Sequence, residues 1–255
     1  MNSVEQLIGL LESSSSAAAF TGAGVSTLSG IRDFRGSKGV YRDADGEKMF
    51  DRSWFDRDPS CYYRNARELI YQIHQKQPSL VHCVLADLEK RGMLPGGVIT
   101  QNIDMLHEKA GSRKIMELHG TPAEHSCVDC SAVYSYEDIL PVTSQGNVPR
   151  CRQCGGVVKP GIVFFGEELP QDQLSMAFHT AAKADLLLVL GSSLVVHPAA
   201  SIPVHTLDNG GKIVIVNQMP TPLDDYAVLR FSNLESVFDK IARYLERKEG
   251  SDTDF

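Results

Sequence analysis

The chain has 255 residues, 42% hydrophobic and 22% charged, which is enough to bury a core in one large or two small domains. Its formal net charge of −7 argues against a broad surface for nucleic acid or an anionic membrane. Residues 1–11 lack the basic region of a signal peptide, and no run reaches the ~18 apolar residues of a membrane span. We expect a cytoplasmic globular protein that binds neither nucleic acid nor membrane directly.

Apolar residues recur at helical spacing in three stretches, 4–11, 81–88 and 174–181. Between them lie short apolar runs without helical period, typical of parallel strands covered on both faces. These runs end just before Thr21, Gln101, His119, Gly191 and Asn217. The alternation predicts an α/β fold with a doubly wound, Rossmann-like parallel sheet.

Two stretches interrupt this alternation. Residues 37–78 are aromatic and charged, and residues 122–158 carry closely spaced cysteines. We read both as insertions into a discontinuous sheet domain of residues 1–36, 79–121 and 159–248. The polar residues 249–255 are expected to form a frayed, flexible tail.

Polar or small residues follow every predicted strand. Because ligands of open α/β sheets bind beyond the carboxyl ends of the strands, these residues together form a candidate site. In chain order they are Gly22, Ala23, Gly24 and Ser26, then Gln101, Asn102 and Asp104, then His119 and Gly120, then Gly191, Ser192 and Ser193, and finally Asn217.

Gly22 and Gly24 permit a tight turn and the approach of a pyrophosphate to backbone N–H groups at a helix start. A simple glycine turn explains the pair equally well. The third glycine of the dinucleotide fingerprint is replaced by Thr27, and no acidic residue closes a second strand about twenty positions later. Both departures disfavour a hydride-transfer dehydrogenase.

Two Cys-x-x-Cys pairs, Cys127 with Cys130 and Cys151 with Cys154, match the ligand spacing of tetrahedral Zn²⁺. Four thiolates leave no open coordination position, so the predicted metal is structural. Disulfides or a redox pair are the alternatives, disfavoured in a chain without an export signal. Cys61 and Cys83 lie in helix-like stretches and are expected to be packing residues.

His119 follows a predicted strand and precedes Gly120, where the bare backbone could admit a substrate. A histidine can take up a proton near neutral pH, so His119 is the candidate general base. The other seven histidines lack this setting. His197, which follows the Gly191 loop, is the least certain of them.

Several segments in order resemble the sirtuins, a family of NAD-dependent protein-lysine deacylases. The resemblance covers about residues 4–240 and is carried by "GAGVSTLSGIRDFRG", "TQNIDMLH", "ELHG", the cysteine pairs, "KPGIVFFGE", "LGSSLVVHPAA" and "IVIVN". It implies a sheet domain that binds NAD⁺, a zinc ribbon at 122–158 and a small helical module at 37–78. It also implies that acyl-lysine enters the cleft between them.

The resemblance implies a role for each matching residue. The implied phosphate and ribose contacts are Ala23, Gly24, Ser26, Arg35, Gly191, Ser192 and Ser193, with Asn217 on the adenosine ribose and Gly22, Thr27, Asp33 and Leu234 as further cofactor contacts. Phe34 would shield the reacting sugar. Asn102, Ile103 and Asp104 would hold the nicotinamide amide, while Gln101 orients the ribose near His119.

The implied reaction transfers the acyl group of acetyl-lysine to ADP-ribose and releases nicotinamide and O-acetyl-ADP-ribose. The acyl oxygen attacks the sugar as nicotinamide leaves, and His119 then acts as general base on a ribose hydroxyl. The implied peptide contacts on the two sides of the cleft are Val163, Phe165, Gly166, Leu194, Val195 and Val196. Strand pairing of this kind demands little of the peptide sequence. Ile162 and Phe164 are expected to be buried.

Two departures from the family pattern stand out. Arg32 replaces the usual proline, which is expected to make the loop less rigid. Relatives that prefer succinyl or malonyl lysine carry Tyr-x-x-Arg, whereas Tyr63 is followed by Ala66, with Arg67 one position late. One position is about 100° around a helix, so we expect a preference for neutral acyl groups.

Three other functions remain open from the sequence. ADP-ribosyl transfer to a protein side chain would use the same NAD pocket without an acyl-lysine channel. A dehydrogenase would produce NADH. An adaptor would use the cysteine-rich stretch for nucleic acid or protein and leave the sheet inert. The leading expectation is a monomeric deacetylase acting on acetylated proteins or peptides.

Overall fold

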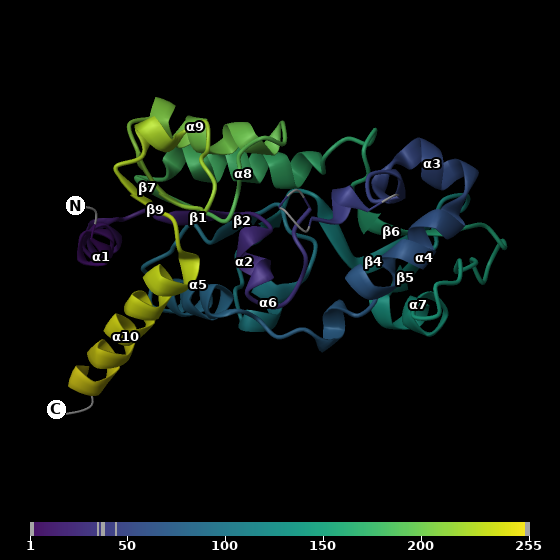
Figure 1. Cartoon of the computed structure of the whole chain (residues 1–255), viewed down its shortest axis with the longest axis horizontal. Helices are drawn as coiled ribbons and strands as arrows, with labels where there is room; N and C mark the ends of the chain where they lie inside the picture. Colours follow the sequence, from purple (N-terminus) through teal and green to yellow (C-terminus); the bar gives the residue numbers. More distant parts are fainter. Residues whose placement is uncertain (1–2, 35, 37–38, 44, 253–255) are drawn as a thin grey trace.

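The structure is a computed structural model that describes residues 3–34, 36, 39–43 and 45–252, with the backbone alone at 249–252. Figure 1 shows a larger part, built on one sheet, and a smaller part beyond one end of it. Arg35, one of the expected cofactor contacts, lies outside the described residues. None of the described helices is both long and apolar enough to cross a membrane.

Six parallel strands form the main sheet in the order β3-β2-β1-β7-β8-β9. They are β1 (Ala18–Thr21), β2 (Val98–Thr100), β3 (Ile115–Glu117), β7 (Leu186–Leu190), β8 (Lys212–Val216) and β9 (Leu229–Phe231). Five coincide with the apolar runs of the sequence, which confirms the predicted doubly wound sheet. The short edge strand β9 is an addition to that prediction. The order reverses between β1 and β7, the place where such sheets bind ligands.

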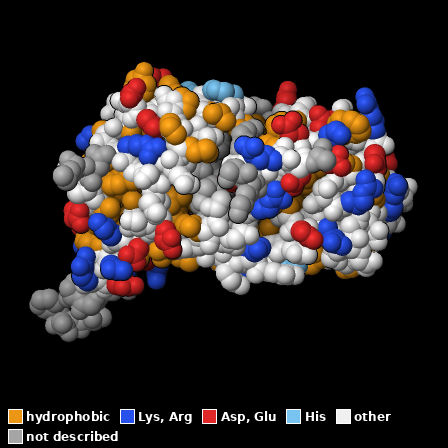
Figure 2. Space-filling view, viewed as in Figure 1, with side chains coloured by type: hydrophobic (Ala, Val, Ile, Leu, Met, Phe, Trp, Pro, Cys, Tyr) orange, Lys and Arg blue, Asp and Glu red, His pale blue; other side chains and the backbone are white. Residues whose placement is uncertain are grey.

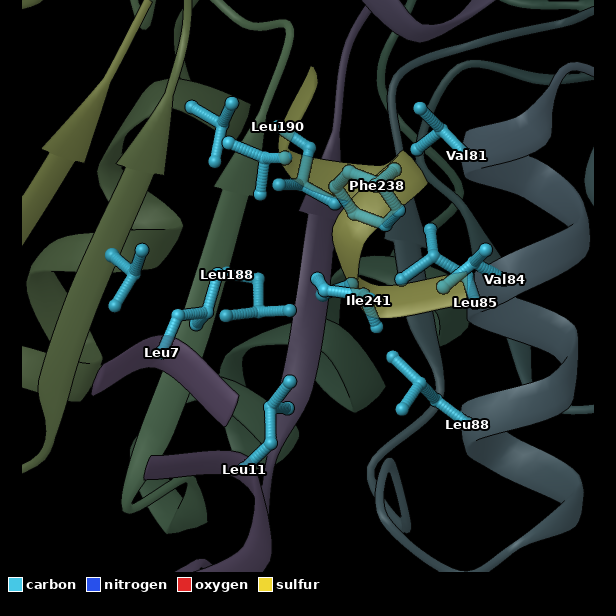
Figure 3. Close-up of a cluster of buried hydrophobic side chains, with 14 of the residues drawn as sticks. Leu7, Leu11, Val81, Val84, Leu85, Leu88, Leu188, Leu190, Phe238 and Ile241 are labelled. Atoms are coloured by element: carbon cyan, nitrogen blue, oxygen red, sulfur yellow. The ribbon is translucent and has the colours of Figure 1, made fainter. Parts of the chain in front are cut away.

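Helices cover both faces of this sheet. They are α1 (Val4–Ser13), α2 (Gly24–Thr27), α5 (Leu80–Lys90), α6 (Leu106–Ala110), α8 (Gln171–Lys183), α9 (Ile202–Asp208) and α10 (Leu234–Asp252), with short 3₁₀ turns at Ala199–Ser201 and Asp224–Tyr226. Leu188 and Leu190 of β7 pack toward α1, α5 and α10, as Figure 3 shows. Leu187 and Val189 pack toward α8 and α9 instead. Successive side chains of a strand point to opposite faces, so one apolar run supplies both cores.

The three helical stretches predicted from apolar spacing are confirmed as α1, α5 and α8. Helix α1 begins with a capping box, because Ser3 and Gln6 exchange side-chain and backbone hydrogen bonds of 3.0 and 3.1 Å. Cys61 is buried, as expected, but the prediction for Cys83 is wrong, since it is exposed on α5. Helix α10 extends to Asp252, into the segment 249–255 that the sequence predicts as a flexible tail.

The smaller part contains an antiparallel sheet in the order β5-β4-β6. Its elements are α3 (Arg52–Arg57), α4 (Pro59–Leu69), β4 (Gly120–Cys127), β5 (Val133–Ser135), α7 (Tyr136–Thr143) and β6 (Val158–Ile162), with 3₁₀ turns at Val40–Arg42, Lys48–Phe50 and Ile73–Gln75. The two stretches that interrupt the α/β alternation share one aromatic core, in which Tyr62, Tyr63 and Phe164 are almost fully buried. Segments 37–78 and 122–158 therefore pack against each other.

Candidate active site

A cavity of about 1220 Å³ lies at the carboxyl ends of the sheet strands, bordered also by the smaller part. Nineteen of the expected site residues line it: Ala23, Gly24, Thr27, Asp33, Phe34, Gln101, Asn102, Ile103, His119, Val163, Phe165, Gly166, Gly191, Ser192, Ser193, Val195, Val196, Asn217 and Leu234. Residues far apart in the sequence are thus brought to one wall, because parallel strands end at the same edge of the sheet.

Five expected site residues do not line this cavity. One of them is Gly120, the first residue of β4. Gly22 and Ser26 lie behind its wall and accept hydrogen bonds from Asn102, which lines it, and Asp104 in turn contacts Ser26. Leu194 is only 4% exposed and belongs to the core beneath α8 and α9, so its side chain is not placed as a peptide contact. Its φ of 54° turns the chain so that Leu194 points inward while Val195, 53% exposed, points outward.

The glycines after β1 and β7 are required by close backbone contact. A Cβ added to Gly24 would lie 2.6 Å from the Cα of Gly191. A Cβ added to Gly22 would lie 2.8 Å from the carbonyl oxygen of Gly191. Gly191 itself has a φ of 62°, in the left-handed region that favours glycine. The Gly24 N–H donates to the Gly191 carbonyl at 2.9 Å, so this N–H is already used within the protein. The glycines therefore join two loops at the floor of the cavity.

A buried hydrogen-bond network holds Asn102 and Asp104. Asn102 Nδ2 donates to the Gly22 carbonyl at 3.2 Å and to Ser26 Oγ at 3.1 Å. Ser26 Oγ donates to Asp104 at 2.5 Å, and Asp104 also accepts the Leu106 N–H at 3.0 Å. Each of these side chains is almost completely shielded from solvent. The network fixes the amide and carboxylate groups before any ligand arrives.

His119 is oriented by a backbone carbonyl. Its Nδ1 lies 2.8 Å from the carbonyl oxygen of Gln101. A carbonyl oxygen only accepts, so Nδ1 carries the proton and Nε2 carries the lone pair of the neutral ring. His119 lines the cavity and is half-buried. The arrangement gives a ring with a defined tautomer that can accept a proton at Nε2.

The Gln101 side chain offers a donor to the cavity. Its Oε1 accepts a hydrogen bond from Ser192 Oγ at 3.1 Å. Its Nε2 is buried and has no hydrogen-bond partner among the described residues. Since a buried polar group without a partner is costly, this amide is suited to donate to a hydroxyl of a bound ligand.

Other histidines differ from His119 in their surroundings. Burial lowers the pKa of His107 to about 3, with His82 lowering it further. Burial also lowers the pKa of His125 to about 4, with Lys159 adding to the shift. These rings are neutral core residues. His197, in contrast, lies on the cavity wall, as His119 does. The expectation that only His119 has this position is therefore wrong for His197.

The far end of the cavity contains residues that the sequence interpretation missed. They follow β8 and β9 and comprise Gln218, Met219, Ser232, Asn233 and Glu235. The signal was present in the run "VLRF" before Ser232, but three strand residues are too few to show a period. Asn217 is 6% exposed and donates from Nδ2 to the Met219 carbonyl at 2.9 Å.

Arg32, the departure from the family proline, is fixed by contacts within its loop. Its guanidinium donates to both carboxylate oxygens of Asp43, at 2.8 and 3.0 Å, and to the Gly39 carbonyl at 3.4 Å. The pair is about half exposed, so its contribution to stability is small. It nevertheless provides a link across the loop that a proline could not make.

The four paired cysteines come together at one end of the antiparallel sheet. Their Sγ atoms all lie within 4.8 Å of one another, and three pairs are separated by 3.4 to 3.5 Å. A tetrahedron of sulfurs with bonds of roughly 2.3 Å to zinc has edges of about 3.8 Å, so the four residues fit this metal. Cys127, Cys130, Cys151 and Cys154 would fill its coordination sphere, which makes the zinc structural.

Comparison with known proteins agrees with this geometry. The Sir2 family model matches residues 22–198. The NAD-dependent protein deacetylase of Thermotoga maritima is 46% identical over 229 residues, 90% of this chain and 92% of that protein.

Two solved structures are also similar over nearly their whole length. A Sir2 complex with a p53 peptide and NAD⁺ is 43% identical, with a TM-score of 0.87, and covers 97% of this chain and 99% of that one. Sir2Tm bound to a propionylated peptide is 42% identical, with a TM-score of 0.85, and covers 96% of this chain and 98% of that one. The chain therefore belongs to the Sir2 family, the NAD-dependent protein deacetylases known as sirtuins.

Proposed function

We propose that this sirtuin removes acetyl and other neutral acyl groups from lysine side chains and transfers them to ADP-ribose, releasing nicotinamide and O-acetyl-ADP-ribose. NAD⁺ is the co-substrate. The observation that carries the proposal is the orientation of His119, whose Nδ1–H donates to Gln101 at 2.8 Å and leaves Nε2 as a base on the cavity wall. A base positioned in this way typically accelerates a reaction about 10²–10⁴-fold.

We assign the cofactor to the side of the cavity formed by the main sheet. Ala23, Gly24, Thr27, the Gly191–Ser193 loop, Asn217 and Leu234 would contact its phosphates and sugars, with Arg35, Gly22 and Asp33 as further expected contacts. Gln101 Nε2, which has no hydrogen-bond partner in the described part of the chain, would donate to a ribose hydroxyl. Phe34 would cover the sugar. Asn102, Ile103, Ser26 and Asp104 would hold the amide of the nicotinamide, directly or through their shared network.

Bound NAD⁺ supplies an electrophilic sugar carbon that the acyl oxygen of lysine attacks. The residues of the chain orient the two reactants and exclude water from the sugar. His119 Nε2 accepts the proton of the ribose hydroxyl that next attacks the former acyl carbon. Water then completes the transfer, with free lysine and O-acetyl-ADP-ribose as the products. Val163, Phe165 and Gly166, together with Val195 and Val196, also line the cavity. These two segments would pair with the peptide backbone.

The preference for neutral acyl groups is supported by the charges around the cavity. Among the described residues, its wall contains no lysine or arginine that could pair with a succinyl or malonyl carboxylate. Tyr63 is fully buried and its hydroxyl donates to the Val158 carbonyl. Arg67 is exposed and contacts Glu68 at 3.2 Å. Neither residue is placed to receive an acyl carboxylate, and a charge buried without a partner is strongly disfavoured.

The proposal is tested with matched acetyl, propionyl and succinyl lysine peptides and NAD⁺, with the products weighed by mass spectrometry. We expect kcat/KM for the acetyl and propionyl peptides to exceed that for the succinyl peptide by about 100-fold or more, the effect of a few kcal/mol. An Arg67→Ala variant should show the same ratios. Equal turnover of the succinyl peptide would refute the preference, and ADP-ribosylated protein without free lysine would refute deacetylation.

Three coarser features complete the proposal. A cytoplasmic location is supported by the thiolates of the four-cysteine cluster, which a reducing compartment preserves. Action as a monomer is also part of the proposal, and the oligomeric state in solution tests it. A peptide rather than nucleic acid as partner is supported by the net charge of −7.

A further inference from the structure

A buried ion pair links the two ends of the segment that we assign to the peptide, Val163–Gly166. Lys159 on β6 is only 8% exposed, and its Nζ lies 2.9 Å from Oε2 of Glu167. The same Nζ donates to the Ile162 carbonyl at 2.8 Å and to the Pro160 carbonyl at 3.2 Å, and it lies 4.2 Å from the ring centre of Phe164. The Lys159 ammonium group therefore interacts with residues in this segment or directly beside it.

Glu167 holds the segment from its other end. Its Oε2 also accepts the Phe164 N–H at 2.8 Å, and its Oε1 accepts Arg52 Nη1 at 2.9 Å. Burial alone would raise the pKa of Glu167, but the donors from Phe164, Lys159 and Arg52 outweigh burial and lower it. The carboxylate is thus charged and satisfied, and it closes the turn in which the Glu167 N–H donates to the Phe164 carbonyl at 3.0 Å.

Arg52 connects this pair to the small helical part. Its backbone N–H donates to the Phe165 carbonyl at 3.0 Å, and the Phe165 N–H donates to the Phe50 carbonyl at 2.7 Å. On the opposite side of the segment, the Val163 N–H donates to the carbonyl of His119 at 2.9 Å. Backbone hydrogen bonds therefore fix the segment on one side to the smaller part and on the other side to His119, the proposed base.

We infer that Lys159 and Glu167 are positioning residues for the acyl-lysine substrate. Their ion pair sets the course of Val163–Gly166, so that Phe164 points into the core and Phe165, 44% exposed, faces the cavity. This inference rests on the function proposed above, since it assumes that the segment binds the peptide. Lys159 does not line the cavity and acts through the backbone, whereas Glu167 is itself part of the cavity wall.

The test replaces Lys159 with methionine, which keeps much of the side-chain volume without the charge. Glu167 retains Arg52 and the Phe164 N–H in this variant, so no buried carboxylate is left alone. Two readouts are measured directly, the Kd of a labelled acetyl-lysine peptide and the Kd of ADP-ribose, together with kcat at saturating peptide.

We expect Lys159→Met to weaken peptide binding about tenfold or more, while the Kd of ADP-ribose and kcat stay within about threefold. Lys159→Arg, which keeps the charge, should restore peptide binding to within about threefold of the wild type. Asp87→Asn is the matched control, because it breaks a partly buried pair of 3.0 Å with Arg91 on α5, away from the cavity. This control should leave both affinities unchanged.

The outcomes separate the two proposals. Unchanged peptide affinity in a folded Lys159→Met protein would overturn the positioning role. An equal loss of ADP-ribose affinity would also overturn the positioning role, because it would show that the substitution disturbs the whole cavity and not the peptide segment alone. If Lys159→Met does not fold, Glu167→Gln provides the same comparison with the acceptor oxygen retained. A wild-type protein that binds the peptide but releases no lysine would contradict the proposed function alone.

Discussion

The two sheets of the molecule are stabilised in different ways. The main sheet has a large apolar core on each face, and all five residues of β7 are buried. The small antiparallel sheet beside the cysteines has a cluster of only five buried residues, Cys127, Tyr134, Ile139, Cys151 and Val158. Two of these five are metal ligands. The main sheet can thus fold on packing alone, whereas the small sheet depends on its metal.

The two sheets also divide the function. The strands of the main sheet end at the cavity and supply the polar groups that we propose to act on the ligands. The small sheet contributes β6, which leads into the peptide segment at Val163, and its metal has no free coordination position. The metal therefore supports the shape of one cavity wall and takes no part in the chemistry.

The largest expected effect is on the metal site. Cys127→Ala should lose zinc and unfold β4–β6, because structural zinc contributes roughly 10–16 kcal/mol to the folding of small zinc domains. Bound zinc is measured by elemental analysis and local protection by hydrogen exchange. The main sheet should remain protected, while deacetylation falls through loss of the peptide segment.

Cys83→Ala is the control for this change, because Cys83 is an exposed cysteine outside the metal cluster. Its zinc content and exchange pattern should match the wild type. Two results would contradict the different dependence of the two sheets on zinc. One is that β4–β6 stay protected from hydrogen exchange in zinc-free Cys127→Ala, and the other is that β1 and β7 lose their protection together with β4–β6.

The next largest effect is on the chemistry at the edge of the main sheet. His119→Ala should reduce deacetylation about 10²–10⁴-fold, because the positioned base is lost. The affinity for NAD⁺ should change by no more than about threefold, since the base acts after binding. Single-turnover kinetics and calorimetry measure the two quantities. His205→Ala, which removes a ring packed on Phe178 of α8, is the control; wild-type turnover in His119→Ala would exclude His119 from the mechanism.

The smallest expected effect is on the pH dependence of the stability of the main sheet. Burial raises the pKa of Glu117 on β3 from 4.5 to about 7, with Glu108 adding to the shift. The unfolded chain releases this proton first, so stability is complete below about pH 4.5 and decreases as the pH rises to about 7. Since Glu117 is partly exposed, we expect a loss of about 1–2 kcal/mol.

Urea unfolding at pH 5 and pH 8 measures this loss. Glu117→Gln, which cannot ionise, should lose about 1–2 kcal/mol less than the wild type between the two pH values. An identical loss in both proteins would show that Glu117 does not contribute to the pH dependence of the main sheet.

Those parts of the fold that depend on local patterns could be predicted from the sequence. Apolar runs such as residues 186–190 identify buried strands because they are buried on both faces. The cysteine spacing indicates the metal ligands, and the strand ends indicate the part of the cavity wall that the main sheet forms. Strand β9 has too few residues to show a pattern.

What the sequence could not show depends on tertiary contact. Leu194 lies between two wall residues but turns into the core, because of a single left-handed backbone angle. Ser26 and Asp104 act from behind the wall through a hydrogen bond between segments 78 positions apart. Lys159 and Glu167 are charged residues in an apolar stretch, and only the packing of the small part reveals that they pair.

The contact between Gly24 and Gly191 has a consequence for engineering the enzyme. No side chain fits between these loops, so residue choice at the floor of the cavity is restricted to glycine. Positions such as Phe165 and Val195, which are exposed at the rim, face no such restriction. Redesign of peptide selectivity can therefore proceed at the rim without altering the contact between the two glycine loops.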